Sequence, residues 1–189
     1  MRKTILTFGL ISGAIASVLM VATVPFMHRI GFEKYGYLIG YTGMVLSFLL
    51  VFFGIRSYRD NVNNGEIGFG KAFTVGIAIT LISCICYVVT WEIVYFNFLG
   101  PGFMDQYAAH AIEKAKASGA SAQAVQAQAQ QMEKLKQLYQ NPLFNSLMTF
   151  IEPFPVGLVI TLLSAAILRK RPKAQAASAR MTVELERPS

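Results

Sequence analysis

The 189-residue sequence has few charged residues and very few that bind metals or form disulfides. Only 14% of its residues are charged, whereas 54% are hydrophobic; soluble domains carry roughly 25% charged residues. This balance excludes an ordinary soluble enzyme, and the high apolar content excludes a disordered chain. The two cysteines, Cys84 and Cys86, are too few for a disulfide-dense secreted module. The two histidines lack a zinc-binding spacing, so we expect no metal and no cofactor.

The apolar residues are concentrated in four segments, each long enough to cross a bilayer as a helix. A hydrocarbon core about 30 Å thick requires roughly 20 mostly apolar residues. The first two segments contain no charge, and the other two contain one glutamate each, Glu92 and Glu152. The predicted spans are residues 4–27, 36–55, 73–99 and 143–168. The sequence therefore predicts an all-α integral membrane four-helix bundle in residues 1–171, with the lipid bilayer as its main partner.

The first apolar segment has a second interpretation as a secretory signal, with a candidate cleavage site after Ala16. The apolar run continues without interruption to Met27, which a cleaved signal would not require. Gly9, Gly13 and Ser17 also have the four-residue spacing that lets membrane helices approach closely. We therefore expect a retained first helix, and a mature N-terminus at Ser17 would contradict this.

The basic residues predict that both termini are cytoplasmic, because Lys and Arg accumulate on that side of a membrane. With this orientation, eleven of the 17 basic residues are cytoplasmic and six are outside. They flank the spans and form no single stripe with aromatic residues, so we expect no nucleic-acid binding. Residues 172–189 have no apolar periodicity and are predicted to be a disordered cytoplasmic tail.

The segment between the third and fourth spans is rich in Ala, Gln, Lys and Glu, which favour helices. Gly119 suits a helix end and Ser121 an N-cap, so residues 103–140 are predicted to form a helical hairpin outside the cytoplasm. A loosely ordered tether is the alternative. Helical spacing also predicts a narrow apolar stripe of Val125, Ala129, Met132, Leu135 and Tyr139.

Glu92 and Glu152 are the candidate proton or ion site. Counted along ideal helices, both lie at a similar depth near the outer boundary of the membrane. Pro153 and Pro155 would free backbone carbonyls beside Glu152, and such carbonyls with carboxylates can bind a cation or relay a proton. We expect the two acids to face the protein, lie close together and share one proton. Their position near the edge favours the alternative, in which the last span begins near Pro153 and the acids sit separately among headgroups.

The loop between the second and third spans carries a recognisable pattern, FGIRSYRD at residues 53–60 followed by GEIGFGKAF at residues 65–73. Together with Trp91-Glu92-Ile93 and Pro155-x-Gly157, it resembles the bacterial family catalogued as domain of unknown function 4199. The resemblance covers roughly residues 4–171. It implies a multi-pass membrane protein with four helices, of a kind common in bacteria, with no assigned activity. We expect it in the bacterial inner membrane.

The same loop contains three basic residues that are candidate contacts for lipid headgroups. Arg56, Arg59 and Lys71 would form one basic cluster if the loop folds back. A nucleotide-binding loop is not expected, because Ala72 occupies the position where a P-loop requires Ser or Thr.

These features predict a structural or interaction component of the membrane and not an enzyme. Residues 103–140 would contact a membrane or periplasmic protein. The alternative is a small ion- or proton-coupled transporter or channel subunit that uses Glu92 and Glu152. Because one chain has few polar groups inside its spans, this alternative requires a homo-oligomer.

Overall fold

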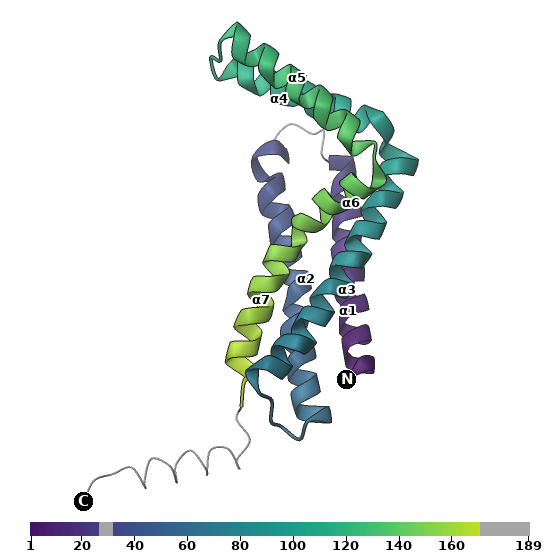
Figure 1. Ribbon diagram of the computed structural model, residues 1–189, viewed down its shortest axis with the longest axis vertical. Helices are drawn as coiled ribbons and strands as arrows, with labels where there is room; N and C mark the ends of the chain where they lie inside the picture. Colours follow the sequence, from purple (N-terminus) through teal and green to yellow (C-terminus); the bar gives the residue numbers. More distant parts are fainter. Residues whose placement is uncertain (27–31, 171–189) are drawn as a thin grey trace, which may run out of the picture. The chain divides into compact units, whose positions relative to one another are not determined.

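The computed structural model describes residues 1–26 and 32–170, and within them the chain is helical with no strand (Figure 1). The predicted all-α fold is therefore confirmed. Four helical segments of the described chain are long and apolar enough to cross a membrane, which supports the predicted multi-pass protein. They are Arg2–Thr23, Leu38–Val62, Phe69–Leu99 and Pro142–Leu168.

The chain forms two compact units. The first, here called the bundle unit, contains Met1–Tyr87 and the segment from Pro153 onward. The second, here called the helix-pair unit, is Val88–Glu152. The predicted tail at residues 172–189 lies outside the described residues.

Four helices make up the bundle unit: α1 (Arg2–Thr23), α2 (Phe32–Val62), residues 69–87 of α3 (Phe69–Val94), and α7 (Pro153–Leu168). The first α-helix is shorter than the predicted span over residues 4–27. It ends at Thr23 and continues as a 3₁₀ turn, η1 (Val24–Phe26), because Pro25 has no N–H to donate and disfavours α-helix before it.

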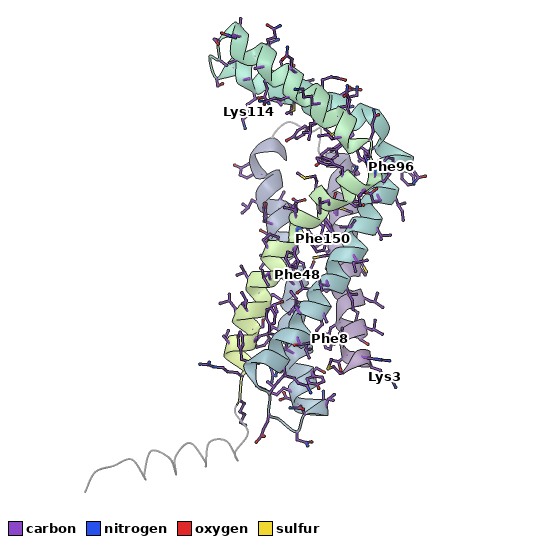
Figure 2. The ribbon with its side chains drawn as sticks, in the orientation of Figure 1. Lys3, Phe8, Phe48, Phe96, Lys114 and Phe150 are labelled. Carbon is purple, nitrogen blue, oxygen red and sulfur yellow. The ribbon has the colours of Figure 1, made fainter. Side chains whose placement is uncertain are left out.

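Glycine positions bring the backbones of the bundle unit into close contact. A Cβ added at Gly13 would lie 2.6 Å from the Cβ of Cys86 and 3.2 Å from the Cα of Ser83. At Gly157 it would lie 2.4 Å from Thr80 Cγ2, and Phe48 packs against the same site (Figure 2). Only glycine permits helices to approach this closely, which is how membrane helices gain van der Waals contact without a hydrophobic driving force.

Buried hydroxyl groups link the same helices by hydrogen bonds. Ser12 Oγ on α1 donates to the Ser47 carbonyl on α2 at 2.8 Å. Ser83 Oγ on α3 donates to the Gly9 carbonyl at 3.2 Å, and the hydroxyls of Thr80 and Thr161 lie 2.9 Å apart. Because hydrocarbon offers no partner for a polar group, each hydroxyl is satisfied inside the protein and holds one helix to another.

The second helix extends seven residues beyond the predicted span end at residue 55, so Arg56 and Arg59 lie on α2 and not in a loop. The helix continues because Tyr58 is buried at 4% exposure and anchors its last turns. The chain then turns at Asn64 and Gly65, both with positive φ. The following Ile67 pairs with Lys170 through two backbone hydrogen bonds, of 3.2 and 2.8 Å, so this loop is joined to the end of α7.

The helix-pair unit contains the end of α3, a π-helical turn η2 (Tyr95–Leu99), α4 (Gly100–Ala117), α5 (Ala122–Tyr139) and α6 (Pro142–Ile151). Figure 1 shows α4 and α5 side by side. They are joined by a turn in which Gly119 has a positive φ of 78° and the Ser121 hydroxyl accepts a hydrogen bond from the Ala124 N–H. The stripe from Val125 to Tyr139 is half-buried, as expected for the face of α5 that meets a neighbour.

The last apolar segment, predicted as one span over residues 143–168, contains two helices. The first, α6, begins after Asn141, whose side chain accepts a hydrogen bond from the Leu143 N–H at 2.9 Å. It ends at Ile151, and α7 begins at Pro153. Pro153 and Pro155 cannot donate backbone hydrogen bonds, so the helical ladder is interrupted at Glu152.

Candidate functional site

A buried amide, Asn145, connects three helices of the helix-pair unit. Its side chain is fully buried, and its Oδ1 accepts a hydrogen bond of 2.8 Å from the Trp91 indole N–H on α3. Its Nδ2 donates to the Tyr139 carbonyl at the end of α5 at 3.3 Å. Thr149, one turn further along α6, donates to the same Oδ1 at 3.4 Å. The sequence reasoning missed this residue; the available signal was a lone amide and a threonine at i, i+4 in an apolar segment.

Aromatic rings surround this amide. Tyr95, 2% exposed, has ring contacts with Trp91, Phe103 and Tyr139 at centroid distances of 5.9, 6.2 and 6.3 Å. Phe144 on α6 contacts Tyr139 at 5.8 Å. Such edge-to-face and tilted pairs stabilise beyond the area they bury. The cluster therefore fixes the base of the α4–α5 pair to α3 and α6.

Glu92 lies next to Trp91 on α3, at the edge of this cluster. Its carboxylate accepts a hydrogen bond from the Ser146 hydroxyl on α6. Its other oxygen, Oε1, is buried and has no hydrogen-bond partner among the residues that the structure describes. A buried carboxylate oxygen without a partner is costly, and it is a natural position for a proton or a cation.

Glu152 has different surroundings from Glu92, although we expected both acids to face the protein and to meet. Its side chain is exposed at the break between α6 and α7. It lies near Tyr139: burial raises the pKa of that phenol, and Tyr107 and Glu152 add to the effect. In the described chain Glu92 bonds to Ser146 and Glu152 lies at the break between α6 and α7. The expectation that the two glutamates lie close together and share one proton stays a prediction.

An ion pair joins the two helices of the α4–α5 pair. The Lys136 ammonium on α5 donates a hydrogen bond to the Asp105 carboxylate on α4. This contact raises the pKa of Lys136, first through the hydrogen bond and also through the charges of Asp105 and Glu133. The pair lies close to Tyr95, so the aromatic cluster continues into a charged contact on the helix pair.

Of the three predicted lipid contacts, two are paired with the same acid. Arg59 binds Asp60 through Nε at 2.7 Å and Nη2 at 3.2 Å, and its Nη1 donates to the Leu168 carbonyl of α7 at 3.5 Å. Arg56 Nε lies 3.6 Å from the same Asp60 carboxylate. Lys71 lies in the first turn of α3 with an exposed side chain. The predicted cluster of three is therefore divided between an Arg–Asp network and a separate lysine.

A comparison with known families identifies one family for this chain. The family model described as a protein of unknown function, DUF4199, matches residues 7–170. The chain belongs to this family. The match confirms the family resemblance carried by the loop after α2 and by the residues around Trp91 and Pro155. No curated protein matches the chain, and no solved structure matches it. In addition, the described residues hold no group of three or more His, Cys, Asp or Glu that could bind a metal ion.

Proposed function

We propose that this protein is a membrane-embedded interaction component and that its α4–α5 pair is the contact surface for another protein. One observation carries the proposal: a segment of 40 residues, 100–139, forms two helices that are not among the four candidate spans. The Ser121 side chain caps α5, an ion pair joins the two helices, and aromatic rings anchor them at their base. Their exposed positions are mainly Gln, Lys, Glu and Ala, a surface suited to a protein partner in water and not to lipid.

The proposal includes an orientation with both termini in the cytoplasm of a bacterium and the α4–α5 pair on the opposite side of the inner membrane. It is supported by the basic residues at the ends of α2 and α7. A membrane-impermeant thiol reagent should label a cysteine placed at Ser118, but not one placed at Ser178. The background would be a variant in which Cys84 and Cys86 are replaced by alanine. Labelling at Ser178 alone would contradict the orientation.

The contact surface is tested by photo-crosslinking in cells. A photoreactive residue at the exposed positions Gln126 and Gln130 of α5 should give one discrete protein adduct. The same residue at Val159 and Leu163, exposed on the apolar helix α7, serves as the matched control and should give lipid adducts only. The proposed contact surface would be contradicted if the α5 and α7 positions gave adducts of the same protein. It would also be contradicted if the α5 positions gave no protein adduct.

A second candidate function is a subunit of a small oligomeric ion- or proton-coupled transporter or channel. The buried, unpartnered Oε1 of Glu92 favours it. In this candidate Glu92 carries the proton or cation, and the exposed Glu152 is secondary. Protein reconstituted into vesicles should then conduct protons down an applied pH gradient. Glu92→Gln should abolish the flux and Glu152→Gln should reduce it little; equal flux in wild type and Glu92→Gln would exclude this role.

A further inference from the structure

Basic side chains are concentrated in the bundle unit where α2 and α7 end, α3 begins and α1 begins. Figure 2 shows Lys3 at the start of α1, and Figure 1 places the N-terminus at the same end of the unit as the loop between α2 and α3. In the described chain only Asp60 and Glu66 oppose them there. The basic residues are Arg2, Lys3, Arg56, Arg59, Lys71, Arg169 and Lys170.

The backbone pairing between Ile67 and Lys170 fixes part of this cluster. Ile67 is 1% exposed, so its side chain anchors the loop in the core while its backbone holds Lys170. Lys71 follows four residues later, in the first turn of α3. The backbone pairing of Ile67 with Lys170, and not a contact between basic side chains, therefore holds the basic end of α7 near the basic start of α3.

The arginines of α2 are already used within the protein. Arg56 and Arg59 both pair with Asp60, and Arg59 also binds the last turn of α7. By contrast, Lys71, Arg169 and Lys170 are exposed and form no ion pair among the described residues. Their charges remain available to a ligand.

Apolar side chains are exposed at the same helix ends as these free cations. Phe69, in the first turn of α3, is 43% exposed, and Ile167, in the last turn of α7, is 70% exposed. Three cations beside exposed apolar groups, at the ends of two helices long enough to span a bilayer, match a ligand with an anionic head and an apolar tail.

We propose that Lys71, Arg169 and Lys170 bind the phosphate of an anionic phospholipid. The cations hold the phosphodiester, and Phe69 and Ile167 contact the upper part of an acyl chain. This assignment replaces Arg56 and Arg59, which both pair with Asp60, by Arg169 and Lys170. It applies whether the protein is an interaction component or a transporter.

The site is tested by native mass spectrometry of the full-length protein in detergent, titrated with phosphatidylglycerol and, separately, with phosphatidylcholine. We expect tighter binding of phosphatidylglycerol, weakened by added salt because the contact is electrostatic. The triple variant K71Q/R169Q/K170Q should lose this preference, with an affinity loss of about fivefold for each charge removed. The backbone pairing of Ile67 and Lys170 does not depend on these side chains, so the variant should retain its fold.

The matched control is K114Q/K116Q/K134Q, which removes the same charge from exposed positions of α4 and α5 and should leave lipid binding unchanged. Equal losses in the two triple variants would overturn the proposal in favour of a net-charge effect. Inorganic phosphate that displaces the lipid at comparable concentration would overturn the lipid assignment. If K71Q/R169Q/K170Q does not fold, the charge-conserving variant K71R/R169K/K170R decides: retained preference supports the site, and lost preference overturns it.

Discussion

The two units of this protein are held together by opposite means. In the bundle unit the smallest residues lie at the contacts, and hydroxyl groups bond directly to the backbone of a neighbouring helix. In the helix-pair unit the largest side chains make the contacts, and one amide serves three helices. The difference follows from the segments that each unit contains. The helices of the bundle unit all belong to candidate spans, and helices in lipid gain little by burying large apolar groups and rely on close backbone packing. The helix-pair unit also contains α4 and α5, which are not candidate spans, and it relies on aromatic contacts.

The units also differ in how completely their polar groups are satisfied. Ser12, Ser83 and Thr80 all have partners inside the bundle unit. The buried side-chain atom that has none among the described residues, Glu92 Oε1, belongs to the helix-pair unit. Buried polar groups without partners are rare in folded proteins and require an explanation. The proton or cation site of the second candidate function is therefore in the helix-pair unit.

The contrast in packing predicts the largest effect at a contact glycine. In Gly13→Ala the new methyl group would meet the Cβ of Cys86 and the backbone of Ser83, neither of which can rotate away. We expect a loss of about 3 kcal/mol in the free energy of unfolding, measured by circular dichroism during denaturation in detergent. The control is Gly40→Ala on α2, where no atom of another segment of the described chain lies within 4 Å of the added Cβ. It should be neutral or stabilise by up to about 1 kcal/mol; equal destabilisation by both substitutions would contradict the close contact.

The helix-pair unit should respond most to loss of its amide. Asn145→Leu leaves the Trp91 N–H and the Tyr139 carbonyl without partners in a buried site. We expect a loss of about 2 kcal/mol and a shifted emission of Trp91, which is the single tryptophan of the chain. The same substitution at the exposed Asn97, whose amide bonds only within its own helix turn, is the control. An unchanged Trp91 emission in Asn145→Leu would mean that the amide does not hold the indole.

Features that depend on composition and local chemistry were predictable from the sequence. The apolar runs defined four spanning segments, and Gly119 with Ser121 defined the turn between α4 and α5. Gly9 and Gly13 were identified by spacing as close-packing positions. Each of these depends on residues within one or two helical turns.

Features that depend on tertiary contacts were not predictable. The extension of α2 past residue 55 depends on the burial of Tyr58, and the pairing of Ile67 with Lys170 joins residues about a hundred positions apart. The π-helical turn that begins at Tyr95 lies beside ring contacts of that residue with α4 and α5. Depth along ideal helices placed Glu92 and Glu152 at one level, but depth does not determine direction. Glu92 turns to Ser146, whereas the break at Pro153 leaves Glu152 exposed.

A smaller effect is expected at the cap of α5, where local chemistry alone acts. Ser121→Ala removes the hydroxyl that accepts from the Ala124 N–H at 3.2 Å. The helix should lose about 1 kcal/mol, seen as faster hydrogen exchange in the first turn of α5. Ser118→Ala, in the same turn but at the C-terminal cap of α4, is the control and should leave exchange in α5 unchanged. Equal exchange in both variants would mean that the cap does not stabilise the helix.

The smallest effect should come from the ion pair between α4 and α5, because Lys136 and Asp105 are partly exposed to water and such pairs are weak. Asp105 raises the pKa of Lys136, so the folded protein binds this proton more tightly than the unfolded chain does. The resulting stabilisation is complete below the unfolded lysine pKa of about 10.4 and is lost as the pH rises through the higher folded value. The difference in melting temperature between the wild type and Lys136→Met should therefore be constant from about pH 7 to 9 and shrink above about pH 10. Lys134→Met, which removes an exposed lysine of the same helix that forms no ion pair among the described residues, should show no such change. If the melting-temperature difference for Lys136→Met does not shrink above about pH 10, the charge of Lys136 does not stabilise the helix pair. The aliphatic stem of Lys136, which lies near Tyr95, would then be the stabilising part of the side chain.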